Sequence, residues 1–172
     1  MRDIFIGNKN NEFIKENLNF YEITKYYWKE NLILNLDKTL YCKRNFYVSG
    51  FFITDCSVVF EQGEYICGNE IIKGSQFIGE DQIIEGDQII EKDQEIKGNQ
   101  IIKKNQFINS NQFIKKSQEI FGDQKIMGNQ FVGKDQVIWK NTIVNKKSII
   151  FRNKIINFHN REFRINDQII NY

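Results

Sequence analysis

Aliphatic residues recur at every sixth position through the middle of the chain, and one phase of this pattern never becomes polar between residues 66 and 156. An α-helix cannot keep such a period on one side, because six residues advance the helix by about 600°. The two-residue alternation of a strand, followed by a turn, does fit a period of six. The pattern therefore predicts one short strand in each hexad, with the strictly aliphatic residue facing inward. The inward series is Ile66, Ile72, Ile78, Ile84, Ile90, Ile96, Ile102, Ile108, Ile114, Ile120, Ile126, Val132, Ile138, Val144, Ile150 and Ile156.

Turn-forming pairs follow the inward residues at short distance, as in Gly86-Asp87 and Gly122-Asp123. Glycine, asparagine and aspartate tolerate positive φ and form tight turns, so each hexad is expected to end in a corner. Two foldings satisfy this pattern: a meander of small hairpins, or a coil that turns the same way at every corner. Strands this short form poor isolated hairpins. A coil stacks each strand on an equivalent one, and we therefore predict the coil.

The repeat resembles the hexapeptide-repeat, left-handed parallel β-helix family, which includes bacterial hexapeptide transferases and γ-class carbonic anhydrases. In that family an aliphatic residue is followed four places later by a small inward residue. Ile138 and Thr142 match this spacing, as do Val144 and Ser148. The resemblance implies an all-β parallel β-helix, a solenoid of about seven turns, over residues 34–172. Residues 1–33 do not keep the hexad, so we expect them to form an irregular or helical N-terminal cap, in which Asn11 could cap a short helix.

Glutamine occupies the family's small inward position throughout the middle of the chain. Alternation along a strand places each glutamine on the same side as the aliphatic residue two places later, which favours an inward over a solvent-facing side chain. With three hexads per turn, residues eighteen apart would stack in three columns, where each amide can donate to one neighbour and accept from another. A single unpaired buried amide would cost about 1–3 kcal/mol, which a ladder avoids. The predicted ladder comprises Gln76, Gln82, Gln88, Gln94, Gln100, Gln106, Gln112, Gln118, Gln124, Gln130 and Gln136.

The outward strand position is also often apolar. Continuous apolar rows on an outer surface are typical of protein contacts. The alternative is that strand propensity alone selects isoleucine and phenylalanine in a gene with AT-rich codons, but that bias does not favour Trp139. The rows are Phe77, Phe113, Phe131 and Ile149; Ile83, Ile101, Val137 and Ile155; and Ile71, Ile89, Phe107 and Ile143. A second outward position adds Phe121, Met127, Trp139 and Phe151.

Candidate catalytic chemistry is sparse. Three histidines hold zinc in the γ-class carbonic anhydrases that the repeat resembles, whereas His159 is the single histidine here. The three cysteines, Cys42, Cys56 and Cys67, have no metal-binding spacing. We therefore expect no metal, no cofactor and no catalysis. The alternative that the resemblance leaves open is a trimeric acyltransferase with acyl-CoA bound between prisms, in which His159 is the general base.

The chain end departs from the repeat. After Ile156 the hexad is interrupted and returns two residues late at Gln168 and Ile170, which predicts a protruding corner loop around His159. From Trp139 onward there are seven basic residues and two acidic ones, whereas residues 70–97 hold eight acidic residues and three lysines. The basic end leaves a limited RNA contact open as a further alternative.

Composition bears on the compartment. The 172-residue chain has a net charge of +2 and contains neither proline nor alanine, and residues with AT-rich codons dominate. We infer an AT-biased genome and an intracellular site, with a mitochondrion or another organelle favoured over the cytoplasm. Neither a signal peptide nor a transmembrane run is evident. The sequence thus favours a non-catalytic solenoid that contacts other subunits of an assembly, as a hetero-oligomer or a β-helix trimer. By resemblance, carbonic-anhydrase-like subunits play such a part in mitochondrial respiratory complex I.

Overall fold

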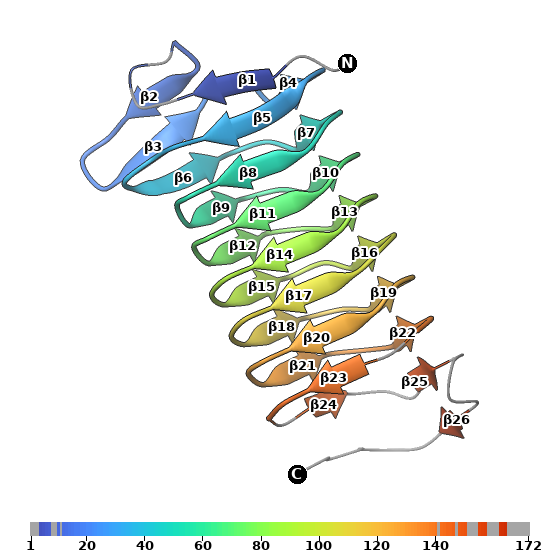
Figure 1. Cartoon of the computed structure of the whole chain (residues 1–172). Coiled ribbons are helices and arrows are strands. Elements are labelled where there is room, and N and C mark those ends of the chain that lie inside the picture. Colours follow the sequence, from blue (N-terminus) through green and yellow to red (C-terminus); the bar gives the residue numbers. More distant parts are fainter. Residues whose placement is uncertain are drawn as a thin grey trace.

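The structure is a computed structural model that describes residues 4–7, 10, 12–140, 142–146, 148–150, 155–157 and 162–164. Within these ranges the chain is an all-β parallel solenoid of about seven turns, without a helix. Most strands are three residues long, and most lie beside the strand three positions later in the chain. Figure 1 shows these strands stacked in rows along one axis. The predicted all-β coil is confirmed. No helix in the described ranges is long and apolar enough to span a membrane.

The strands of the described residues form three sheets, one for each side of the coil. The first sheet contains β1 (Ile4–Gly7), β5 (Asn31–Leu34), β8 (Phe52–Thr54), β11 (Glu70–Ile72), β14 (Gln88–Ile90), β17 (Gln106–Ile108), β20 (Gln124–Ile126) and β23 (Thr142–Val144). The second contains β2 (Ile14–Glu16), β3 (Phe20–Ile23), β6 (Thr39–Cys42), β9 (Val58–Phe60), β12 (Gln76–Ile78), β15 (Gln94–Ile96), β18 (Gln112–Ile114), β21 (Gln130–Val132) and β24 (Ser148–Ile150). The third contains β4 (Tyr27–Trp28), β7 (Phe46–Val48), β10 (Glu64–Ile66), β13 (Gln82–Ile84), β16 (Gln100–Ile102), β19 (Gln118–Ile120), β22 (Gln136–Ile138), β25 (Ile155–Asn157) and β26 (Glu162–Arg164).

The pairing register explains where the hexad is visible in the sequence. From the pair Leu40 and Val58 to the pair Gln130 and Ser148, partners lie eighteen residues apart, which is three hexads. Closer to the N-terminus the turns are longer, since Leu32 pairs with Phe52, twenty residues further on. The extra residues shift the phase of the repeat, so the coil continues in space where the hexad is lost in the sequence.

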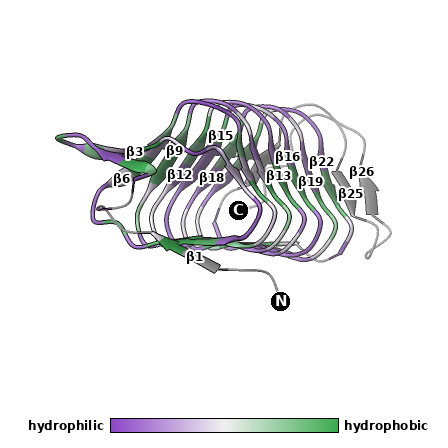
Figure 2. Cartoon of the chain, turned by 90° about the horizontal axis from the view of Figure 1, so that it is seen from above, coloured by the Kyte–Doolittle hydropathy of each residue, from purple (hydrophilic) through white to green (hydrophobic). Residues whose placement is uncertain are grey.

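The N-terminal segment contains strands. β2 and β3 form an antiparallel hairpin, and β3, β4 and β5 pair in parallel with strands of the following turn. Asn11, the expected helix cap, lies outside the described residues. The division of the chain at residue 34 stays a prediction. In Figure 2 the segment around β3 projects beyond the outline of the stacked turns.

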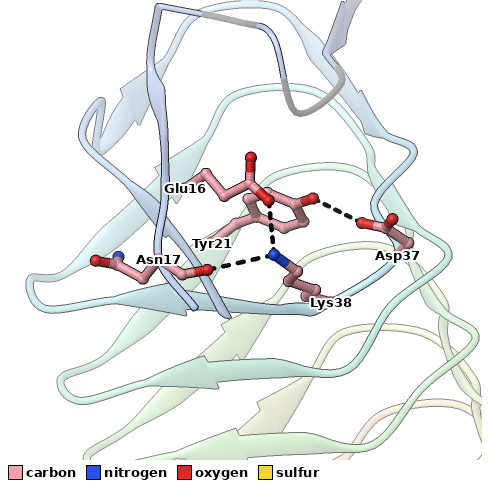
Figure 3. A network of polar contacts seen from close by, with 5 residues as sticks. All are labelled: Glu16, Asn17, Tyr21, Asp37 and Lys38. Carbon is pink, nitrogen blue, oxygen red and sulfur yellow. Dashed lines mark hydrogen bonds and ion pairs between the residues drawn. The ribbon is translucent and has the colours of Figure 1, made fainter. Parts of the chain in front are cut away.

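A polar network holds this hairpin to the next turn (Figure 3). The Nζ of Lys38 lies 2.6 Å from the Oε1 of Glu16 and donates to the carbonyl oxygen of Asn17 at 3.3 Å. The buried Tyr21 donates its hydroxyl to the Oδ1 of Asp37 at 2.7 Å, and this bond raises the pKa of Tyr21 to about 12. The hairpin is therefore fastened by both a charged pair and a buried aromatic residue.

The side chains that line the interior change in type along the axis of the coil. The inward aliphatic residues from Ile66 to Ile138 are all buried, as predicted, and each buried side chain of this size contributes about 1.5–3 kcal/mol. Toward the N-terminus, Phe46 and Phe52 take the hexad position that glutamine occupies further along the chain. Phe46 stacks on Phe60 with ring centroids 4.9 Å apart, and Phe52 contacts Phe46 at 5.3 Å. The core thus changes from aromatic to amide-lined along the coil.

The corners are held by ladders of hydrogen bonds between successive turns. The Oδ1 of Asp93 accepts from the backbone N–H of Asn111 at 3.0 Å, and the Oδ1 of Asn111 accepts in turn from the N–H of Asn129 at 2.9 Å. Gly122 lies at a corner, as expected, and its φ lies outside the positive region that glycine tolerates. A Cβ at Gly122 would instead lie 2.5 Å from the carbonyl oxygen of Lys104 in the preceding turn. Close approach between turns explains this glycine.

At the C-terminal end the repeat slips earlier than predicted. Ile156 lies opposite Val137 in the register of β25 on β22, where an unbroken hexad would place it opposite Ile138. The phase of the backbone register has therefore shifted by one residue before β25. β25 then pairs antiparallel with β26. Gln168 and Ile170 lie outside the described residues.

Candidate functional site

The eleven predicted ladder glutamines all point inward. None exposes more than 2% of its surface. The strand register places them in the predicted columns, with Gln76 beside Gln94, Gln82 beside Gln100 and Gln88 beside Gln106. Along each column the Nε2 of one glutamine donates to the Oε1 of the glutamine eighteen residues earlier, at 2.7–3.0 Å. These bonds give the buried amides partners on the neighbouring turns.

The amides also bond across the columns, which the sequence pattern did not reveal. Gln106 Nε2 lies 2.8 Å from the Oε1 of Gln88, 3.3 Å from that of Gln94 and 3.0 Å from that of Gln100. The side chains of the three columns therefore converge on the axis of the coil and form one continuous network. Every Nε2 in this network points toward the N-terminal end, and every Oε1 points toward the C-terminal end. The amide array is thus polar along its whole length.

Two carboxyl groups terminate this array at its N-terminal end. Glu64 and Glu70 occupy the two hexad positions before Gln76, and both are buried. The Nε2 of Gln76 donates to the Oε2 of Glu64 at 2.9 Å and to the Oε1 of Glu70 at 2.7 Å. Gln88 donates to Glu70 at 2.7 Å. Because the preceding positions are aromatic, this end of the array needs groups that accept without requiring acceptors of their own.

The pKa values of both carboxyl groups are raised. Burial raises the pKa of Glu64 well above its ordinary value, and the neighbouring charge of Glu70 raises it further. Burial also raises the pKa of Glu70 to about 7, against the opposing effect of the hydrogen bond from Glu64. The Oε1 of Glu64 is buried and has no hydrogen-bond partner among the described residues. Both carboxyl groups therefore keep their protons to a higher pH than exposed glutamates do.

At its C-terminal end the array meets two hydroxyl side chains. The Oγ of Ser148 donates to the Oε1 of Gln130 at 3.2 Å. Thr142 replaces glutamine in the column of Gln124, and its buried Oγ1 has no hydrogen-bond partner among the described residues. The small residues that carried the family resemblance therefore lie where the amide array ends.

The predicted outward rows are arranged in columns on the three sheets. On the second sheet, Phe77, Glu95, Phe113 and Phe131 follow one another on successive turns. The rings of Phe113 and Phe131 stack with centroids 4.6 Å apart, and Phe113 is 40% exposed. A groove of about 770 Å³ runs between this row and the adjacent corner column of Ser75, Asp93, Asn111 and Asn129. This face combines a row of three phenylalanines, interrupted by Glu95, with the larger of the two grooves.

The other two faces carry weaker versions of the same arrangement. On the third sheet, Ile83, Ile101 and Val137 line a groove of about 330 Å³ that Glu119 interrupts. On the first sheet, Ile71, Ile89 and Phe107 follow one another, and the Nζ of Lys125 lies 5.6 Å from the ring centroid of Phe107. Ile143 continues that row and is 53% exposed.

Two of the remaining predicted contact residues form a pair at a corner. Phe121 stacks on Trp139 with centroids 5.4 Å apart, and the indole N–H of Trp139 donates to the Oε1 of Glu119 at 3.1 Å. Met127 accepts a bond from the side-chain amide of Asn145 at 3.3 Å. Phe121 and Trp139 therefore form one stacked pair, in which Trp139 is 39% exposed.

The remaining predicted residues cannot be placed. His159 and Phe151 lie outside the described residues, as do most basic residues of the C-terminal end. In the described part of the chain, no group of three or more histidine, cysteine, aspartate or glutamate side chains could hold a metal ion. The thiols of Cys42 and Cys56 are buried, and burial raises the pKa of Cys42 to about 12.

In comparisons with models of protein families, with curated proteins and with solved structures, none matches this chain.

Proposed function

We propose that this chain is a non-catalytic structural subunit, a stiff prism that presents apolar rows to other proteins of an intracellular assembly. The observation that carries the proposal is the aromatic row of the second sheet. Phe77, Phe113 and Phe131 lie on one flat face beside a groove of about 770 Å³. Exposed aromatic residues beside a groove are typical of the anchors of protein interfaces.

The interior supports the same proposal. Each turn is joined to the next by parallel backbone bonds, by the corner ladders and by the buried amides, as at Gln100 and Gln82, 2.8 Å apart. Polar groups that are satisfied in this way resist bending, because any displacement of one turn would leave buried donors and acceptors unpaired. A prism of this kind holds its outward rows at fixed spacing, which is the property that a structural subunit needs.

The test is the state of the native protein. A structural subunit is expected to migrate on a native gel far above the 20.6 kDa of a single chain, together with partners that co-purify. Substitution of Phe113 by glutamate should release those partners, whereas Lys104→Glu, at an exposed corner outside the apolar rows, is the control and should retain them. Migration as a free monomer would contradict the proposal.

An acyltransferase that uses His159 predicts a different result. Acetyl-CoA should then raise the melting temperature, since a ligand that binds only the folded state stabilises it. Transfer of the acetyl group to an acceptor should be lost in His159→Ala. A structural subunit should ignore acetyl-CoA, and its native partners should be retained in His159→Ala.

A further inference from the structure

From Glu61 to Lys134, the edge between the second and third sheets carries acidic residues on the turns before Gly98 and basic residues on the turns after it. Lys43 and Arg44 precede this stretch and Asp135 follows it. One column of this edge is defined by backbone bonds from turn to turn. Gly98 donates to the carbonyl oxygen of Glu80 at 2.9 Å, Lys116 to that of Gly98 at 3.3 Å and Lys134 to that of Lys116 at 3.1 Å. Glu80 is therefore one turn before Gly98 and Lys116 is one turn after it. The charge changes sign at a residue without a side chain.

The neighbouring positions of the same edge follow this division. Glu61 and Asp81 lie on the turns before Gly98, and Lys115 lies on the turn after it. Glu61, Glu80, Lys115, Lys116 and Lys134 are all exposed. Among the described residues, no ion pair includes Glu80, Lys116 or Lys134. Their charges are therefore available to a neighbour.

We propose that a second copy of this chain docks on the second sheet, antiparallel to the first, about a two-fold axis at the level of Gly98. The axis lies in the plane of the contact and runs across the prism. Rotation by 180° then places Glu80 of each copy opposite Lys116 of the other, because the two residues lie at equal distances on either side of Gly98. The same rotation brings Glu61 to the level of the second copy's Lys134. Opposite charges then meet at the level of these residues on the turns either side of Gly98, and a two-fold contact closes on itself.

The apolar row obeys the same symmetry. Phe77 lies one turn before Glu95 and Phe113 lies one turn after it, so the rotation sets Phe77 of one copy against Phe113 of the other. Val59 is in the same way set against Phe131, two turns from the centre. On the central turn the rotation sets Glu95 against Glu95 and Lys97 against Lys97 of the second copy, and each Glu95 lies beside a Lys97 of opposite charge. Apolar contact at the middle of the face and charge pairs at its edge are the usual division of an interface.

A parallel arrangement lacks this match. A parallel dimer needs a two-fold axis along the prisms, which sets the edge of Glu80 and Lys116 against the opposite edge of the second sheet, so these two residues no longer meet. The inference rests on the proposed function in one respect, namely that the row of Phe77, Phe113 and Phe131 is a contact surface. The inference adds that the partner is a second copy of this chain and that the two prisms are antiparallel.

The experiment is a charge exchange in the full chain, followed by sedimentation equilibrium. The wild type is expected to dimerise, and Glu80→Lys or Lys116→Glu alone should each raise the dissociation constant about tenfold or more, since each change creates two like-charge contacts. An equimolar mixture of the two variants should dimerise as the wild type does, and so should the double variant. Lys104→Glu, which makes the same charge change at the other edge of the third sheet, is the control and should have no effect. Unchanged circular dichroism and melting temperature show that each variant is folded.

Three results would overturn the inference. A chain that stays monomeric up to roughly 1 mM has no such contact. A dimer that neither single variant weakens, or that the mixture fails to restore, is not antiparallel in the stated register. If the chain is monomeric but Phe113→Glu still releases a different native partner, this inference fails while the proposed function stands.

Discussion

The side-chain amide of Gln82 donates to the Oε2 of Glu64 at 2.7 Å, so the last donor of one amide column meets a carboxyl oxygen eighteen residues earlier in the chain. The same amide also lies 3.0 Å from the Oε1 of Gln76. A polar array of this length needs an acceptor at the end where its N–H groups point. The Glu64 and Glu70 pair provides that acceptor, and the raised pKa values of the pair make the stability of the fold depend on pH.

Stability should therefore fall as pH rises. Both carboxyl groups have a higher pKa in the folded chain than in the unfolded chain, so the folded state holds more protons between the two values. Their contribution is greatest below an unfolded pKa of about 4.5 and decreases as pH rises through about 7 for Glu70. The melting temperature should accordingly be lower at alkaline than at mildly acidic pH. Thermal unfolding followed by circular dichroism across this interval measures the effect.

Glu64→Gln should remove much of that dependence. A glutamine amide at this position can donate to the Glu70 carboxylate at every pH, whereas Glu64 can donate only while it is protonated. The Oε1 of the new glutamine still accepts from Gln82. We expect the variant to be more stable than the wild type at alkaline pH, by on the order of 1–3 kcal/mol. Equal pH dependence of the variant and the wild type would contradict the assignment of that dependence to this pair.

Gln100→Leu tests the network at its centre. The Oε1 of Gln100 accepts from Gln106, Gln112 and Gln118, and its Nε2 donates to the column neighbour Gln82. Leucine has a similar volume but leaves these groups without one partner each, so the free energy of unfolding should fall by about 2–4 kcal/mol. Urea denaturation measures the change.

The loss of stability at position 100 is compared with that at the C-terminal end of the network and that on the surface. Gln136→Leu, near the C-terminal end, removes only the two donor bonds to Gln118 and Gln124 and should cost less than Gln100→Leu. Lys104→Ala, on the surface of the same turn as Gln100, should change the stability by no more than about 0.5 kcal/mol. Equal costs at positions 100, 136 and 104 would mean that the amides do not act as a network.

Thr142→Gln should stabilise the fold. The buried hydroxyl of Thr142 has no partner among the described residues, and the position follows Gln124 in its column. A glutamine there can donate to the Oε1 of Gln124 and lengthen the array by one member, for a gain of about 0.5–1.5 kcal/mol. Thr142→Leu is the matched control, because it adds volume without a donor. A stabilisation by leucine that equals that by glutamine would contradict the role of the hydrogen bond.

The corner ladder can be tested at Asp93. Its Oδ1 accepts from the hydroxyl of Ser110 at 2.6 Å and from the backbone N–H of Asn111 at 3.0 Å, and these bonds lower the pKa of the carboxyl. Asp93→Ala should cost about 1–2 kcal/mol at neutral pH. Asp93→Asn should cost less, since asparagine fills the same role one turn later at Asn111. Denaturation of both variants measures the difference, and equal losses would show that the lost acceptor is not the cause.

Much of the fold follows from the hexad alone. The inward isoleucines, the three glutamine columns and the grouping of the outward rows could all be predicted, because a fixed period of six with eighteen residues per turn leaves one arrangement of neighbours. The bonds across the columns could not be predicted, since they depend on how closely the three sides approach the axis. Turns of nineteen or twenty residues, as between Leu32 and Phe52, also hide the repeat, because the alternation restarts in a different phase.

The carboxyl pair was missed although a signal existed. Glu64 and Glu70 precede Gln76 at the same six-residue interval, so their phase alone places them inside. A glutamate close to the acidic corner residues is easily taken for surface charge unless its place in the hexad is considered. Glu70 is one of the eight acidic residues counted in residues 70–97. The change of charge around Gly98 also follows the six-residue spacing. It can be recognised only once Glu80, Gly98 and Lys116 are known to lie in one column.

The central claim is that the glutamines form one buried, mutually bonded array, and hydrogen exchange of their side-chain amides tests it most directly. In a nuclear magnetic resonance experiment the Nε2 protons of Gln94, Gln100 and Gln106 should exchange orders of magnitude more slowly than those of free glutamine, because each is buried and bonded on neighbouring turns. The side-chain amide of the exposed Asn109 provides the reference. Exchange of the glutamine protons at the rate of free glutamine would contradict the account.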